Sequence, residues 1–112
     1  MLIIANTFTR PSKSVPFFAM PEDIRAQFLQ NYRSTGKSPA TTTEMSTDGL
    51  TAVVTTTWAT RAAFDEFKAD PMSETLRSLR TAYLIESGIQ LSEDKQFVPS
   101  FGDEGAEPPV QG

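Results

Sequence analysis

Few side chains in this sequence are suited to catalysis or specific recognition, and those few lie in otherwise apolar stretches. They are an amide, an indole and two phenols, namely Asn6, Trp58, Tyr32 and Tyr83. The 112 residues include no His and no Cys. The chain therefore lacks the usual general base near neutral pH, the usual haem ligand and any thiolate metal site or disulfide. We expect no cofactor, and chemistry that depends on hydrogen-bond donors around a bound molecule.

Composition narrows the class of protein further. Ten Lys and Arg residues stand against fourteen Asp and Glu, a net charge of -4 without a basic cluster. An acidic chain is repelled by phosphate backbones, which disfavours nucleic-acid binding. The segment MLIIANTFTR lacks the basic start and cleavage site of a signal peptide, and no run approaches the roughly 20 apolar residues of a membrane helix. We expect a cytoplasmic protein that binds neither nucleic acid nor membrane.

The amide belongs to the first predicted strand, over residues 2–9. Strand alternation places Asn6 on the same face as Leu2, Ile4 and Phe8. An amide among apolar neighbours either bonds to the backbone or points at a ligand, and both interpretations stay open. The apolar connection over residues 15–20 has a similar ambiguity, since it either covers the core or forms a lid over a pocket.

The order of the remaining elements predicts the fold class. Apolar periodicity predicts a helix over residues 21–34, and a second helix that starts at Thr60, is broken at Asp70-Pro71 and ends at Gly88. Three further strands are predicted over residues 38–46, 50–58 and 89–98. This β-α-β-β-α-β order is typical of the ferredoxin-like α+β fold, an antiparallel sheet with two helices on one face. The domain would span residues 1–98, followed by a flexible acidic Pro/Gly tail over 99–112.

One face of the predicted sheet has no helix to cover it. It would carry Ile3, Ala5, Val53 and several Thr side chains, none of them charged or bulky. We expect two copies of the chain to pair through these faces as a homodimer.

The run TTTWATRAAFDEFKADP, at residues 55–71, resembles the strand-to-helix signature of the dimeric α/β-barrel superfamily. It is most similar to antibiotic-biosynthesis-monooxygenase-type domains, which have an aromatic strand end, a Ser or Thr cap, a basic residue, AF-x-x-[FW] and an acidic stop. Asn6 matches an asparagine of several members, and the resemblance spans residues 1–98. It implies a dimeric barrel in a functionally mixed superfamily that includes cofactor-free quinone-forming monooxygenases.

The resemblance does not extend to the haem enzymes of the superfamily. Where the haem-degrading members carry a tryptophan on the second helix, this chain has Phe67. Their haem-ligating histidine falls near Leu76, in a chain without histidine. Haem degradation and chlorite dismutation are therefore disfavoured.

Three functions remain open. The first is binding of a fatty-acid-like or polycyclic aromatic molecule in a hydrophobic pocket between the helices and the sheet of each subunit. The predicted lining is Leu2, Ile4, Asn6, Phe8, Phe28, Tyr32, Trp58, Phe64, Phe67, Leu76, Leu79 and Tyr83. Arg10 or Arg80 would pair with an acidic head group.

The second is a cofactor-independent monooxygenase for phenolic or polyketide-like substrates, with Asn6 and the Trp58 indole N–H as catalytic donors. The third is an oligomeric structural domain without chemistry.

Overall fold

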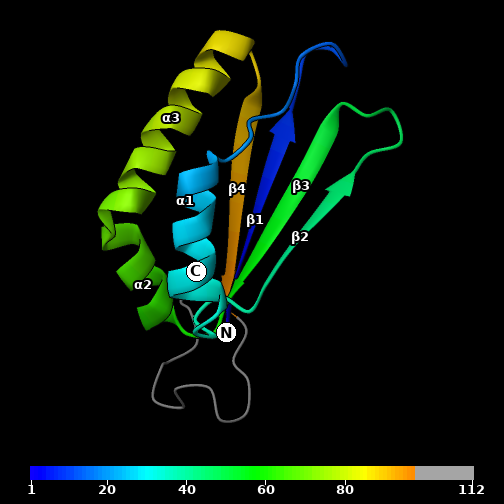
Figure 1. The fold of residues 1–112 in the computed structure, drawn as a ribbon. Coiled ribbons are helices and arrows are strands. Elements are labelled where there is room, and N and C mark those ends of the chain that lie inside the picture. The colour runs from blue at the N-terminus through cyan, green and yellow to red at the C-terminus, as the bar shows by residue number, and fades with distance from the viewer. Residues whose placement is uncertain (98–112) are drawn as a thin grey trace.

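A four-stranded antiparallel sheet with helices along one side makes up the fold (Figure 1). The computed structural model describes residues 1–97. In chain order the elements are β1 (Leu2–Thr9), α1 (Glu22–Phe28), the π-helical turn η1 (Leu29–Arg33), β2 (Ala40–Met45), β3 (Thr51–Trp58), α2 (Arg61–Ala69), α3 (Pro71–Ser87) and β4 (Gln90–Phe97). The strand order β2-β3-β1-β4 confirms the predicted ferredoxin-like fold. The predicted tail over residues 99–112 lies outside the described part of the chain.

Strand pairing decides which side chains face the helices. In the middle of β1, Asn6 lies opposite Val54 of β3 and Glu93 of β4. Directly paired residues of an antiparallel sheet share a face, so all three lie on the same side as Leu2 and Ile4, which are buried in the core beneath the helices. The predicted alternation of β1 is confirmed.

The break in the second half of the chain follows from local capping chemistry. Thr60 caps α2, because its Oγ1 accepts a hydrogen bond from the Ala63 amide at 3.0 Å. Asp70 ends α2 and caps α3, where its Oδ1 accepts from the Met72 amide at 2.9 Å. Pro71 fits the first turn of α3 because its missing N–H has no partner there. The predicted interruption at Asp70-Pro71 is confirmed.

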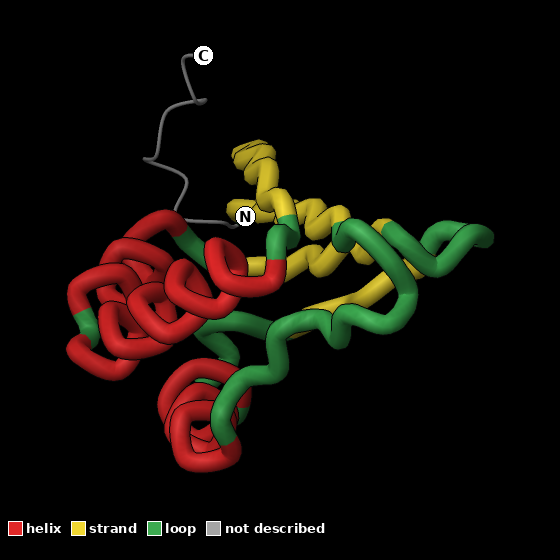
Figure 2. The backbone as a smooth tube through the Cα atoms, turned by 90° about the horizontal axis from the view of Figure 1, so that it is seen from above, coloured by secondary structure: helices red, strands yellow, loops and turns green. Residues whose placement is uncertain are grey.

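Figure 2 shows the helices gathered on one side of the strands. The β2–β3 hairpin diverges from the helices toward its turn (Figure 1), and every residue of β2 is exposed. The opposite face of β1 and β3 carries no helix, as predicted. Within residues 1–97, no helix combines the length and apolar character needed to span a bilayer.

Candidate functional site

An aromatic cluster fills one end of the space between the helices and the sheet. The Trp58 ring, at the end of β3, lies 4.9 Å from Phe67, 5.6 Å from Phe64 and 5.8 Å from Tyr32 between centroids. Phe28 joins from α1, at 5.7 Å from Phe67. Trp58 and Tyr32 are each only 2% exposed. These distances are those of packed aromatic pairs, so this end of the space is occupied by the protein's own side chains.

A hydrogen bond holds the proton of Tyr32 in place. The Tyr32 hydroxyl donates to Asp70 Oδ2 at 2.6 Å. Burial, this hydrogen bond and the negative charges of Asp70 and Glu66 all raise the pKa of Tyr32 above its ordinary value. Tyr32 is therefore a poor proton acceptor near neutral pH, and its hydroxyl ties η1 to the start of α3.

The inward stripe of α3 contains an arginine. Met72, Leu76 and Leu84 are buried, and Arg80 stands between the last two at the same spacing of four residues. Leu79, which was predicted to line the pocket, lies off this stripe and is 44% exposed. The signal that identifies Arg80 was present in the sequence, as the continuation of the Met72–Leu76 period toward Leu84.

Two buried polar atoms, one on β1 and one on α3, have no partner among the described residues. Among the described residues, Asn6 Oδ1 and Arg80 Nε are buried without a hydrogen bond. An unpaired buried group costs about 1–3 kcal/mol, and proteins pair nearly all such groups. Asn6 Oδ1 is an acceptor and Arg80 Nε–H is a donor, so this part of the molecule offers one free group of each kind.

Glu93 connects these two side chains. It lies directly opposite Asn6 in the β1–β4 register, on the helix-facing side of the sheet. Burial lowers the pKa of the Arg80 guanidinium, and the nearby charge of Glu93 partly offsets that effect. Glu93 is thus paired with Asn6 in the register and acts electrostatically on Arg80, and we call these three side chains the polar group of the site. Glu93 was not among the predicted site residues, because residues 93–95 belong to an exposed edge strand, β4, and only the register shows that Glu93 lies opposite Asn6.

Arg10 ties the connection between β1 and α1 to the turn between β2 and β3. Arg10 Nε donates to the Gly49 carbonyl at 2.9 Å and its Nη1 to the Val15 carbonyl at 3.0 Å. The guanidinium also lies 4.4 Å from the Phe17 ring centroid. Arg10 is thus engaged with the protein itself, which leaves Arg80 as the candidate partner for a polar ligand group.

Tyr83 anchors the same connection to α3. Its hydroxyl donates to the Pro16 carbonyl, and its ring lies 5.9 Å from Phe18. Phe18 and Met20 pack against the core cluster. These contacts favour the interpretation that residues 15–20 cover the core.

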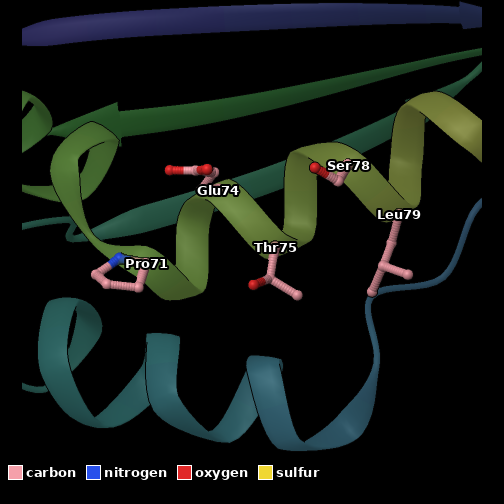
Figure 3. Close-up of a pocket in the computed structure, with 5 residues that line it drawn as sticks. All are labelled: Pro71, Glu74, Thr75, Ser78 and Leu79. Atoms are coloured by element: carbon pink, nitrogen blue, oxygen red, sulfur yellow. The ribbon is translucent and has the colours of Figure 1, made fainter.

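A shallow hollow of about 350 Å³ lies on the surface of α3 rather than beneath it. Its lining residues are Pro71, Glu74, Thr75, Ser78 and Leu79. Figure 3 shows Pro71, Thr75 and Leu79 pointing toward α1. The hollow is separate from the polar group of the site, because its residues lie off the Met72–Leu76–Arg80 stripe.

The predicted site residues thus divide into two sets. Phe28, Tyr32, Trp58, Phe64 and Phe67 belong to the packed aromatic end. Ile4, Asn6 and Phe8 follow one another along the helix-facing side of β1, and only Asn6 among them offers an unpaired polar atom. The ligand-binding and catalytic roles assigned to these residues stay predictions. Within residues 1–97, no group of three or more acidic residues is placed to hold a metal ion.

Comparison with solved structures places this fold among known proteins. A protein described as a "putative antibiotic biosynthesis monooxygenase" from Deinococcus radiodurans superposes with a TM-score of 0.60 over 100% of both chains, at 12% identity. The chain shares the fold of that protein. Rv0793 from Mycobacterium tuberculosis gives a TM-score of 0.57 at 14% identity, over 90% of this chain and 98% of its own. The predicted resemblance is confirmed for the fold, whereas no protein-family model and no curated protein matches the sequence.

Proposed function

We propose that this protein binds a small, largely apolar organic molecule between α3 and the sheet, with the oxygen of its polar group at Asn6 and Arg80. The observation that carries this proposal is the pair of unpaired buried atoms, Asn6 Oδ1 and Arg80 Nε. A ligand oxygen at this position would give the Arg80 Nε–H an acceptor, and a ligand hydroxyl would also give Asn6 Oδ1 a donor.

The surroundings of the polar group favour an apolar ligand body. Phe8 follows Asn6 on the helix-facing side of β1, and Leu76 and Leu84 flank Arg80 on the inward stripe of α3. Apolar walls with a few placed polar groups are typical of small-molecule sites. Since the Trp58 end is packed, the ligand body would extend toward Phe8. A fused-ring phenol and a medium-length fatty acid are the two shapes that suit these walls.

Cofactor-independent oxygenation is the second candidate function. It is favoured by the likeness to the Deinococcus radiodurans protein, whose description names monooxygenase chemistry. In such a reaction a bound phenol and dioxygen give a quinone and water, one oxygen atom entering at a ring C–H carbon and the other leaving as water. The Arg80 donor would stabilise the negative charge that develops on the substrate oxygen during the reaction.

We also propose that the protein is a homodimer, paired through the helix-free face of the sheet. The centre of that face is uncharged, with Ile3 and Ala5 of β1 beside Thr57 and Thr55 of β3. On β4 the same face carries Asp94, opposite Ala5 and nearer the edge. An uncharged centre with charge toward the rim is typical of protein interfaces, and a two-fold axis would bring the same patch of both copies together.

Calorimetric titration with 2-naphthol and with decanoate tests the binding proposal. We expect at least one of them to bind the native protein, and Asn6→Ala and Arg80→Gln each to weaken that binding by about tenfold, the equivalent of 1.4 kcal/mol. Arg25→Gln serves as the matched control, because Arg25 is an exposed residue of α1 that pairs with Glu22. Unchanged affinity in both site variants would refute the assignment.

Oxygen consumption distinguishes the second candidate from simple binding. The native protein would be incubated with a panel of dihydroxynaphthalenes under air and under nitrogen. Oxygen uptake that is measured at saturating substrate and is abolished by Asn6→Ala supports catalysis. No uptake across the panel by a protein that binds 2-naphthol leaves binding as the function.

A further inference from the structure

We infer that Glu93 sets the charge selectivity of this site, so that it accepts an uncharged, hydroxyl-bearing molecule and rejects a carboxylate anion. This inference rests on the proposed binding function and decides between the two ligand shapes considered there. The residue was not among the predicted site residues, and its position follows only from the strand pairing.

The first argument is the position of the carboxylate. Glu93 faces Asn6 across β1 and β4 on the side covered by the helices. Opposed residues of neighbouring antiparallel strands have Cβ atoms about 4.5–5.5 Å apart. A ligand oxygen held by Asn6 would therefore lie close to the Glu93 carboxylate. A second negative charge there would be repelled, whereas a neutral hydroxyl would not.

The second argument is the hydrogen-bonding capacity of the unpaired atoms. A hydroxyl both donates and accepts, so one ligand hydroxyl suits Asn6 Oδ1 and the Arg80 Nε–H together. A carboxylate only accepts. It would leave Asn6 Oδ1 without a donor and place two oxygen acceptors side by side. The amide and Glu93 thus oppose an anion for independent reasons.

Two charged side chains act on Arg80, and Glu93 is the one of opposite sign. Lys95, on the same face of β4, lies 3.6 Å from Glu93, but both side chains are more than 40% exposed and solvent screens the pair. The Lys95 ammonium also lies 5.3 Å from the Phe64 ring, toward α2. Arg77 of α3 donates to Ser73 Oγ and to the Lys68 carbonyl, and its positive charge, like burial, lowers the pKa of Arg80.

A matched ligand pair tests the inference. 2-Naphthol and 2-naphthoate share a ring system and differ in charge at pH 7. We expect the native protein to bind 2-naphthol about tenfold or more tightly than 2-naphthoate. Glu93→Gln should raise the affinity for 2-naphthoate by about tenfold, since a like charge beside the ligand oxygen is removed, and should change the affinity for 2-naphthol by less than about threefold. Glu93→Ser provides a second variant with the same expectation.

Asp94→Asn is the control, because it removes the same charge from the neighbouring residue on the opposite face of β4, where Asp94 pairs with Ala5. It should leave both affinities unchanged. The inference is overturned if the native protein prefers 2-naphthoate, or if the ratio of the two affinities is the same in Glu93→Gln and in the native protein. If neither ligand binds the native protein, the binding proposal itself fails. The two failures are therefore distinguishable.

Discussion

The unpaired buried atoms of Asn6 and Arg80 separate this site from the rest of the core. The other buried polar side chains have clear structural partners, as Ser38 does in donating to the Thr57 carbonyl at 2.8 Å. The sequence analysis left open whether Asn6 is a structural amide or a ligand contact. Because Asn6 Oδ1 accepts no hydrogen bond from the described residues, the amide does not act as a structural acceptor, and the cost of burying it favours a functional role.

Replacing Asn6 by leucine measures that cost directly. The two side chains are similar in size, and removing an unsatisfied buried acceptor is expected to raise the free energy of unfolding by about 1 kcal/mol. Urea denaturation of the two proteins without ligand provides the measurement. Thr7→Val, on the opposite face of β1, is the control for a polar-to-apolar change in the same strand. A loss of stability of similar size in Asn6→Leu would instead identify Asn6 as structural.

At the scale of elements, Asp70 links three parts of the fold. One carboxylate oxygen caps α3 and the other accepts the Tyr32 hydroxyl, while the backbone N–H of the same residue bonds to the Phe67 carbonyl at the end of α2. Tyr32 reaches Asp70 from a π-helical turn, whose extra residue per turn is seen where the Ser34 amide bonds to the Leu29 carbonyl. The helices beside the site are therefore fixed relative to one another at the end opposite the polar group.

Replacing Tyr32 by phenylalanine should weaken this link in a pH-dependent way. At pH 7 the variant should lose about 1.5–3 kcal/mol of unfolding free energy, as expected for a hydrogen bond to a charged group. The pKa of Tyr32 is raised on folding, so the stabilisation is present below the ordinary tyrosine pKa of about 10 and is lost as pH rises above it. The difference in stability between the two proteins should therefore stay constant from pH 8 to about pH 10 and shrink as the pH rises from 10 to 11. A difference that does not shrink above pH 10 would contradict the assignment.

At the scale of the whole molecule, the sheet has one face packed against helices and one face that is bare in a single copy. On β1 and β3 the bare face is only partly exposed, and it carries Ile3, Ala5, Val53 and threonines. A stable interface buries about 800 Å² on each partner, and the bare face is the side of the sheet that would supply it. The dimer proposal concerns this face alone, because the site lies on the other.

Introducing a charge at the centre of the bare face tests the dimer. Ala5→Arg should convert a dimer into a monomer, since a buried unpaired charge at the interface costs several kcal/mol. Sedimentation or light scattering at micromolar concentration gives the mass, and Thr81→Arg, on the exposed side of α3, controls for added charge. A native protein that sediments as a monomer rules out the proposed pairing.

The sequence by itself determined the order of the elements, the helix break at Asp70-Pro71 and the face of β1 that carries Asn6. Each of these depends on side-chain periodicity or on capping within a few residues, and such signals are local. Only the tertiary structure decided that Trp58 and Tyr32 are buried in an aromatic cluster, and that Glu93 lies opposite Asn6 on the side of the sheet that faces the helices. The first outcome depends on how the rings of four elements meet, and the second on the register between β1 and β4. Both are contacts between residues far apart in the chain, which local patterns do not specify.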